Sequence, residues 1–468
     1  MLVKIASAAL LGIEAYPVDV EVDISTGLPG CVTVGLPDAA VRESKERVRT
    51  ALKNCGYEMP SRKLTINLAP ADRRKEGSAF DLPISLGLLA FLDVISPEAI
   101  QKYLFAGELA MDGRLKPIRG VLPIALLAQR KGFQAVVVPK DNEREAALVD
   151  GIKIYSLDNI VEVIKLLNEP ESVPPCCLSL ADILSAPFYE GDFAEVKGQQ
   201  HVKRGLEVAA AGAHNILLIG PPGAGKTMLA KRLPTILPPM SFEEIVEVTQ
   251  IYSAAGLLKD KGAVCARPFR SPHHTITDPG LIGGGNIPRP GEVSLAHHGV
   301  LFLDELPEFR RRVLEDLRQP LEDGMVVVSR VAASVRYPSS FMLVAAMNPC
   351  EDVFRGLTRH EADCTEAQRS KYYAKISGPL LDRIDIQVEV PEVKFRDIVS
   401  RAEGESSEKI RERVTRARQR QLQRFRGKSV YANAQMGARE IKRFCAVDAD
   451  SQTLLETAVT KLGFSARA

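Results

Sequence analysis

The feature that most constrains this chain is the run GPPGAGKT at residues 220–227. It follows the apolar stretch NILLIG (215–220), precedes the helical pattern MLAKRL, and fits G-x-x-x-x-G-K-[ST] at every fixed position. Two more near-continuous apolar runs, VLFLDE (300–305) and FMLVAAMN (341–348), are typical of strands that helices cover on both faces. The sequence therefore predicts an α/β fold with a parallel sheet and a phosphate-binding loop.

The residue types of this loop fit phosphate chemistry. Glycines allow backbone N–H groups to turn inward around phosphate oxygens at the positive end of a helix. Lys226 is expected to bridge the terminal phosphates, and Thr227 to place its hydroxyl on Mg²⁺. The predicted cofactor-binding residues are Gly220, Pro221, Pro222, Gly223, Ala224, Gly225, Lys226 and Thr227.

Carboxylates follow a second predicted strand, in LFLDEL (301–306). Asp304 is expected to hold Mg²⁺ together with Thr227, and Glu305 to orient and activate a water molecule. A third strand ends at Asn348, which either positions that water or simply begins a turn before Pro349. These residues predict nucleoside-triphosphate hydrolysis, and ATP is favoured because no guanine-reading Asn-Lys-x-Asp stretch occurs.

Composition limits the class of protein. The 61 basic and 59 acidic side chains leave a net charge of +2, which excludes a globally basic nucleic-acid coat but not a local basic surface. No apolar run reaches the ~18 residues that span a bilayer. Eight cysteines without framework spacing fit a reducing compartment. We therefore expect a soluble cytoplasmic protein without a membrane segment.

The pattern of strand-like and helical segments changes along the chain and predicts four parts. Strand-like runs (19–25, 63–70, 135–139) alternate with helical patterns (38–56, 122–132) in an α+β N-terminal domain. The predicted parts are an N-terminal domain (1–167), a proline-containing linker (168–190), an ATPase core (191–395) and a helical lid (396–468).

Several long motifs resemble the ComM/YifB family of magnesium-chelatase-like AAA+ ATPases. They are GPPGAGKT, RPFRSPHHTIT (267–277), LIGGG (281–285), RPGEVSLAHHGVLFLDELPEF (289–309), FMLVAAMNPC (341–350), ISGPLLDRID (376–385) and, in the first domain, KEGSAFDLPISLGLL (75–89). The resemblance covers nearly the whole chain. It implies an AAA+ P-loop sheet with a helical lid, preceded by an α+β domain that resembles the Lon-protease domain.

The resemblance also implies roles for individual residues. Asn348 matches sensor 1, Arg383 the arginine finger that completes a neighbouring subunit's site in a hexameric ring, and Arg467 the sensor 2 arginine. The alternative for Arg383 is a structural ion pair with Asp382 or Asp385. Relatives continue with a helix beyond the sensor 2 motif, so we expect an incomplete lid at Ala468.

Two further site hypotheses are weaker. A Lon-type protease needs a Ser–Lys pair, but Leu122 stands where the lysine would align with Ser78, so we expect no proteolysis. Cys350 and Cys364, with Asp352 and His360, make an unusual zinc set, and two free thiols are favoured. The adjacent pairs His273–His274 and His297–His298 could not each hold one metal ion as part of a strand, because neighbouring side chains would point to opposite faces. We expect hydrogen-bonding or DNA- and interface-facing roles for them.

DNA is the favoured partner. Residues 409–428 hold nine Lys or Arg and one Glu, which indicates either phosphate binding or an ordinary solvated or subunit-facing helix. The stretch 324–338 predicts a hairpin that could aim Arg330 or Arg336 into a central pore. The family implies a ring-shaped motor for DNA branch migration in recombination and natural transformation; a chelatase-like metal-insertion or protein-remodelling ATPase is the alternative, and a protease the third.

Overall fold

A computed structural model describes residues 2–28, 30–59, 62–184, 186, 188–258, 262–285, 288–330, 333–350, 365–393, 404–428 and 430–462. The chain forms two compact units. Unit 1 comprises residues 1–186 and 242–265, and unit 2 comprises residues 187–241 and 266–468. Within the described ranges, no helix combines the length and apolar character needed to cross a bilayer.

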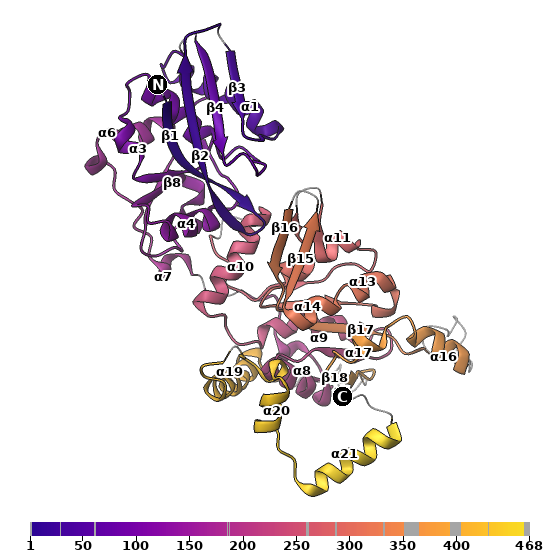
Figure 1. The fold of residues 1–468 in the computed structure, drawn as a ribbon. Coiled ribbons are helices and arrows are strands. Elements are labelled where there is room, and N and C mark those ends of the chain that lie inside the picture. The colour runs from indigo at the N-terminus through magenta and orange to yellow at the C-terminus, as the bar shows by residue number, and fades with distance from the viewer. Residues whose placement is uncertain are drawn as a thin grey trace. The chain divides into compact units, whose positions relative to one another are not determined.

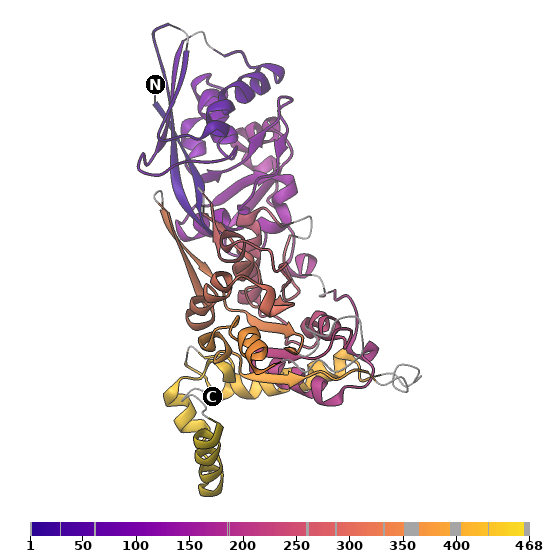
Figure 2. The same ribbon diagram turned by 90° about the vertical axis from the view of Figure 1, so that its right-hand side faces the viewer.

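Unit 1 contains a four-stranded sheet in the order β1-β2-β4-β3. Alternate residues of β2 are buried, as expected for a sheet covered on one face, and Figure 2 shows helices on one side of these strands. The strands are β1 (Leu2–Leu11), β2 (Glu14–Ser25), β3 (Gly30–Val34) and β4 (Lys63–Ala69), and the helices that follow them are α1 (Ala39–Asn54), α2 (Asp81–Phe91) and α3 (Pro97–Ile100).

The rest of unit 1 is built around a short parallel sheet in the order β5-β8-β9 and a two-stranded ribbon, β6-β7. The strands are β5 (Tyr103–Phe105), β6 (Glu108–Leu109), β7 (Leu115–Lys116), β8 (Ala135–Pro139) and β9 (Lys153–Leu157). The helices are α4 (Val121–Arg130), α5 (Glu143–Ala146), α6 (Ile160–Asn168) and α7 (Leu180–Ile183). The strands and helices predicted at 19–25, 38–56, 63–70, 122–132 and 135–139 are all confirmed to within a few residues at their ends.

One segment of the predicted ATPase core belongs to unit 1 instead. Helix α10 (Phe242–Ala255) is inserted in the sequence of unit 2, but the Gln250 side chain donates to the Ile13 carbonyl (2.8 Å) and Gly120 N–H donates to the Ser253 carbonyl (3.2 Å). The Ser253 hydroxyl also bonds to the buried Glu145 carboxylate. The compact units therefore differ from the contiguous boundaries that we predicted, because sequence order does not tell which core an inserted helix joins.

Unit 2 is built on a five-stranded parallel sheet in the order β11-β14-β17-β10-β18. Its strands are β10 (Ile216–Ile219), β11 (Phe269–Arg270), β14 (Val300–Leu303), β17 (Met342–Met347) and β18 (Ile386–Glu389). The central strands are buried along their length, as the apolar runs predicted. Around the sheet lie α8 (Gln200–Gly212), α9 (Lys226–Arg232), α11 (Asp278–Ile282), α12 (Glu292–Leu295), α13 (Arg311–Glu315), α14 (Arg318–Asp323), α16 (Glu366–Tyr373) and α17 (Gly378–Leu381).

Two short ribbons and a helical tail complete unit 2 (Figure 1). The ribbons pair β12 (Gly283–Gly284) with β13 (Arg289–Pro290), and β15 (Met325–Arg330) with β16 (Ala333–Pro338). The second ribbon is the predicted hairpin. The tail contains α19 (Ser407–Arg424), α20 (Ala438–Phe444) and α21 (Ala449–Leu462).

Candidate active site

Polar residues follow three neighbouring strands of the unit 2 sheet. The phosphate loop follows β10, Asp304 and Glu305 follow β14, and Asn348 follows β17. These strands are adjacent and parallel, so their carboxyl ends open onto one edge of the sheet. The sheet order thus gathers residues that lie far apart in the sequence.

The loop between β10 and α9 needs glycine for two different reasons. Gly223 and Gly225 have φ angles of 81° and 90°, in the left-handed region that favours glycine. At Gly220 a Cβ would lie only 2.1 Å from the carbonyl oxygen of Val390, so no side chain fits. The loop can therefore turn backbone N–H groups toward a ligand at the start of α9.

Lys226 is held at the centre of the site. Its side chain is 7% exposed, and Nζ donates to the carbonyl oxygens of Gly220 (2.6 Å) and Pro221 (2.8 Å) and to Asn348 Oδ1 (2.9 Å). An ammonium group has three hydrogens to donate, so phosphate oxygens could replace these partners without leaving it unsatisfied. The structure thus brings the loop lysine and the tip of β17 into direct contact.

Thr227 and Asp304 form the second polar contact. The Thr227 hydroxyl donates to Asp304 Oδ2 at 2.6 Å. A hydroxyl and a carboxylate are hard oxygen donors of the kind that Mg²⁺ prefers. The donor set therefore fits Mg²⁺, and these two side chains could hold it beside the phosphate loop.

Glu305 lies next to Asp304 in an uncommon backbone conformation. Its φ angle is 53°, in the left-handed region, and its N–H donates to Asp304 Oδ1 at 3.0 Å. Its side chain is half exposed, and Oε2 lies 3.3 Å from Nδ1 of His274. Backbone strain of this kind costs free energy and tends to occur at functional sites. The carboxylate is thus accessible, and it contacts an imidazole.

Arg383 lies in a different part of unit 2. It follows α17, is 8% exposed, donates through Nη1 to the Pro379 carbonyl (2.7 Å) and forms an ion pair with Glu322. Asp385, one of the partners considered from the sequence, instead accepts hydrogen bonds from His214 (3.0 Å) and from the Asn215 N–H (3.3 Å). Within this single chain the guanidinium is therefore held by an acidic residue that the sequence did not point to.

Three comparisons with family profiles cover most of the sequence. Residues 192–398 match the family described as magnesium chelatase, subunit ChlI; residues 20–142 match subunit ChlI of Mg-chelatase; and residues 404–468 match the C-terminal part of subunit ChlI. The chain is 42% identical over 467 residues to the competence protein ComM of Haemophilus influenzae, covering 99% of this chain and 90% of that protein. It is 43% identical over 463 residues to the uncharacterized protein YifB of Salmonella typhimurium, covering 98% and 89%.

The chain belongs to the ComM/YifB family of magnesium-chelatase-like AAA+ proteins. It is also 26% identical over 231 residues to the magnesium-chelatase 38 kDa subunit of Rhodobacter capsulatus, covering 45% of this chain and 58% of that protein. Membership of the ComM/YifB family indicates an ATPase and, in general, dependence on ATP and Mg²⁺. The predicted family and the α/β fold class are thus confirmed.

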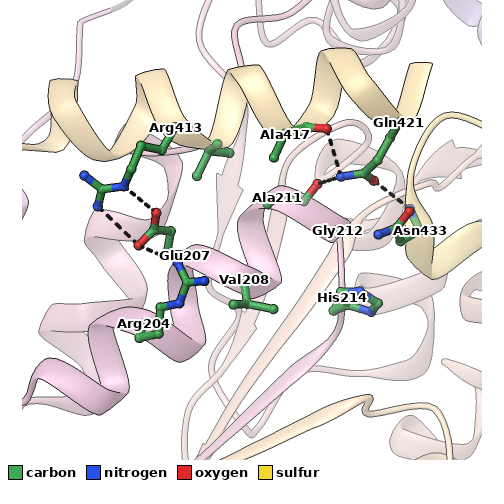
Figure 3. A pocket seen from close by; sticks show the side chains of 11 residues that line it. Arg204, Glu207, Val208, Ala211, Gly212, His214, Arg413, Ala417, Gln421 and Asn433 are labelled. Carbon is green, nitrogen blue, oxygen red and sulfur yellow. Dashed lines mark hydrogen bonds and ion pairs between the residues drawn. The ribbon is translucent and has the colours of Figure 1, made fainter. Parts of the chain in front are cut away.

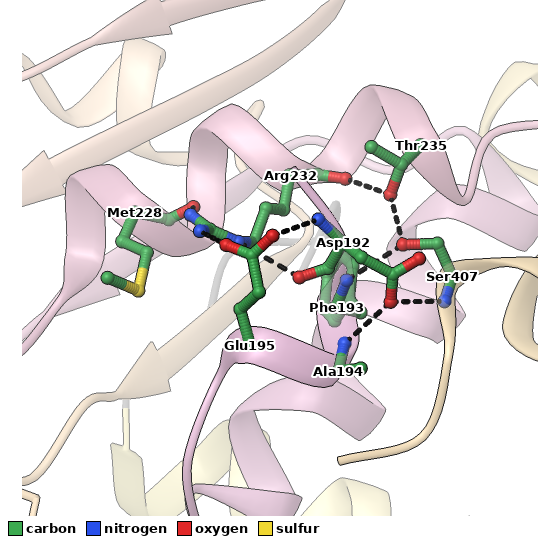
Figure 4. A network of polar contacts seen from close by, with 8 residues as sticks. All are labelled: Asp192, Phe193, Ala194, Glu195, Met228, Arg232, Thr235 and Ser407. Atoms are coloured by element: carbon green, nitrogen blue, oxygen red, sulfur yellow. Dashed lines mark hydrogen bonds and ion pairs between the residues drawn. The ribbon is translucent and has the colours of Figure 1, made fainter. Parts of the chain in front are cut away.

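A polar network ties the phosphate-loop helix of this ComM/YifB protein to its first tail helix (Figure 4). Arg232, at the end of α9, donates to the Asp192 carbonyl (3.0 Å) and pairs with Glu195. The Asp192 carboxylate accepts the Ser407 N–H (3.0 Å), and the Ser407 hydroxyl accepts the Phe193 N–H (2.8 Å). The start of α19 is therefore fixed to the element that carries Lys226.

The basic run 409–428 is partly used inside unit 2. Ile410 and Val414 bury one face of α19, Arg411 donates to the Thr235 carbonyl (2.9 Å), and Arg413 forms an ion pair with Glu207 of α8 (2.7 Å). A cavity of about 330 Å³ lies between α8 and α19, with Gln421 bonded to the Ala211 carbonyl at one end (Figure 3). These contacts favour the structural interpretation for the inward face of α19, whereas Lys409, Arg416, Arg420, Arg424 and Arg426 remain exposed.

The hairpin places its two arginines on opposite faces. One face is formed by the buried side chains of Val326, Val328, Val335 and Tyr337. Arg330 lies on the same face, because it follows Val326 and Val328 at alternate positions of β15. Arg336 pairs across the ribbon with Val327 on the exposed face. Both arginines are exposed, but only Arg336 lies on the outward face of the ribbon.

Both histidine pairs make hydrogen bonds, as we expected: His273 Nδ1 bonds to the Thr275 hydroxyl (2.9 Å), and His297 Nδ1 accepts the Ser340 N–H (3.0 Å). They lie in turns rather than on strands, and their ring centroids are 4.1 Å (His273–His274) and 3.9 Å (His297–His298) apart. The role of His274 beside Glu305 was missed because the contact joins segments distant in sequence, although the pair itself was noticed.

The cysteine expectation is only partly tested. Cys350 is buried and disulfide-bonded, so the expectation of a free thiol there was wrong. Cys364, Asp352, His360 and Arg467 lie outside the described residues.

Proposed function

We propose that this chain is a ring-forming AAA+ ATPase that moves on DNA, as a branch-migration helicase of homologous recombination and natural transformation. The observation that carries the ATPase part is the convergence of Lys226, Thr227, Asp304, Glu305 and Asn348 at the carboxyl ends of three adjacent parallel strands. The DNA part is supported by the exposed Arg336 on the hairpin and by the name of a full-length relative, a competence protein.

Each residue has a distinct task in this proposal. Lys226 and the loop N–H groups bind the phosphates, and Glu305 takes a proton from the attacking water while Asn348 orients it. Mg²⁺, held by Thr227 and Asp304, would neutralise charge on the phosphates. The sensor 2 role of Arg467 stays a prediction from the family resemblance.

The DNA proposal is tested by the ATPase rate of the purified protein with single-stranded, duplex and branched DNA at two salt concentrations. We expect branched DNA to stimulate hydrolysis, and higher salt to weaken the stimulation because phosphate contacts release counterions. Arg336→Ala should reduce the stimulation and leave the rate without DNA unchanged. A hydrolysis rate that none of the three DNAs changes would favour the alternative, a chelatase-like metal-insertion or protein-remodelling ATPase. The 26% identity to a magnesium-chelatase subunit supports that alternative.

We further propose that Arg383 acts on the nucleotide of the next subunit in a head-to-tail ring, with six subunits as the family expectation. An arginine finger accelerates hydrolysis by about 10³–10⁵. Arg383→Ala and Glu305→Gln should each be inactive alone, but a mixture of the two should recover activity. Some interfaces then pair an intact Glu305 with an intact Arg383. Absence of recovery among subunits that demonstrably exchange would contradict action in trans.

A further inference from the structure

Arg383 is fixed at both its backbone and its guanidinium. Its carbonyl accepts a hydrogen bond from Asn215 Nδ2 (2.8 Å), which lies at the start of the strand that leads into the phosphate loop. Its Nη1 donates to the Pro379 carbonyl (2.7 Å), and its Nη2 pairs with Glu322 Oε1. The guanidinium therefore has a defined position within the single chain, and the Glu322 carboxylate of α14 helps to hold it there.

That carboxylate lies at the base of the hairpin. Glu322 is on α14, and Gly324, in the left-handed conformation (φ 63°), ends α14 and leads directly into β15. Gly324 N–H donates to the Pro320 carbonyl (3.0 Å), and the Gly324 carbonyl accepts the Ser339 N–H (2.8 Å) that closes the base of the ribbon. Hydrogen bonds of Gly324 thus join the end of α14 to the base of the hairpin, and Figure 1 shows α14 next to β15.

We propose that Glu322 is a positioning residue for Arg383 and that it links this arginine to the base of the β15–β16 hairpin. The proposal rests on the proposed function, in which Arg383 completes a neighbour's ATP site and the hairpin contacts DNA. Arginine has a long side chain with many rotamers, and a carboxylate partner restricts them in advance. A displacement of the hairpin base moves Glu322 and thereby changes the placement of the guanidinium.

A purely structural role predicts something different. The Glu322 side chain is 49% exposed, and ion pairs with an exposed partner contribute little to folding stability. Glu322→Gln keeps the shape and removes the charge, so it should fold like the native protein. Its defect should appear in the turnover number and in the response to DNA, not in the unfolding midpoint.

The test compares Glu322→Gln with a matched control, Glu315→Gln. Glu315 is also in unit 2, is 44% exposed and pairs with Arg311 at 3.1 Å. We expect Glu322→Gln to lower kcat for ATP at least tenfold with KM unchanged, because an arginine finger stabilises charge that develops in the transition state rather than bound ATP. The ratio of rates with and without branched DNA should also fall. Glu315→Gln should leave all three quantities at native values.

Mixtures of variant subunits test whether the loss of activity in Glu322→Gln comes from a misplaced Arg383. Glu322→Gln subunits have an intact ATP site and a misplaced finger, so mixing them with Glu305→Gln subunits should restore activity. Mixing them with Arg383→Ala subunits should not, because both partners then lack a working finger. Should Glu322→Gln fail to fold, Glu322→Asp, which keeps the charge but shortens the side chain, carries the same mixing test.

The outcomes distinguish a failure of the proposed role of Glu322 from a failure of the proposed trans role of Arg383. Native kcat in Glu322→Gln, or no recovery with Glu305→Gln when Arg383→Ala does recover with it, overturns the role of Glu322 and leaves the trans arginine intact. If Arg383→Ala itself gives no recovery among exchanging subunits, the trans arginine fails and the role of Glu322 fails with it.

Discussion

Unit 1 and unit 2 each have a lysine and a hydroxyl residue near the start of a helix, with carboxylates nearby. The two units differ in what these side chains contact. In unit 1, Lys75 is fully buried and donates to the Arg73 carbonyl (2.8 Å), and the Ser78 hydroxyl bonds to Glu108. Burial lowers the pKa of Lys75. These groups are satisfied by neighbours within the same fold.

In unit 2 the corresponding groups face the open edge of a parallel sheet. Lys226 is held by loop carbonyls that a phosphate could replace, and Thr227 bonds to Asp304. Both units contain a buried lysine held by backbone oxygens, so burial of a lysine alone does not indicate a site. The distinguishing feature is the glycine-rich turn and the carboxylates at adjacent strand ends.

The largest expected effect is in unit 2. Glu305→Gln keeps the shape of the side chain but removes the base, so hydrolysis should fall by about 10²–10⁴ while ATP stays bound. Lys226→Ala removes a phosphate contact and should weaken ATP binding itself. Single-turnover hydrolysis and equilibrium nucleotide titration separate the two effects. Hydrolysis by Glu305→Gln at the native rate would show that the site is wrongly assigned.

An intermediate effect is expected in unit 1 at Asp81. This carboxylate is fully buried and bonded to Arg47 through both oxygens (2.8 and 3.0 Å). Burial raises its pKa from 3.8 to about 6, although Arg47 acts in the opposite direction. Since the folded state binds this proton more tightly than the unfolded state, the resulting stability is complete below about pH 4 and is lost as the pH rises through 6.

The free energy of unfolding should therefore fall by roughly 2–3 kcal/mol between pH 4 and pH 7 through this group. Asp81→Asn, which is neutral at every pH, should remove that part of the dependence. Urea unfolding followed by circular dichroism measures it, and hydrogen exchange in residues 81–91 locates it. An unchanged pH slope in Asp81→Asn would mean that Arg47 keeps the carboxylate ionised in the folded state.

The smallest effect is expected at Ser78. The hydroxyl bonds to a carboxylate, and Leu122, at the position where a catalytic lysine would align, is an apolar residue buried in α4. Ser78→Ala should leave ATP hydrolysis and its response to DNA unchanged, and the native protein should not degrade casein with ATP. Degradation by the native protein that disappears in Ser78→Ala would break the contrast between the two units.

Much of unit 2 was predictable because its signals are local. The phosphate loop, the buried strands and the carboxylates at the end of β14 follow from short sequence patterns, since each depends on a few neighbouring residues. The hairpin at 324–338 was also predictable, because alternating residues specify a ribbon. The sequence alone thus determined the fold class, the family and the residues that we propose for binding the nucleotide phosphates.

Only the tertiary structure decided which distant residues meet. Helix α10 lies within the sequence of unit 2, but it packs into unit 1 because its partners, Ile13, Gly120 and Glu145, are there. His274 contacts Glu305, and Glu322 contacts Arg383. The residues of each pair are far apart in the sequence, and no sequence pattern connects them. Local patterns fix the conformation of a segment, whereas a contact between side chains far apart in sequence depends on how strands are ordered and helices docked, which no single segment encodes.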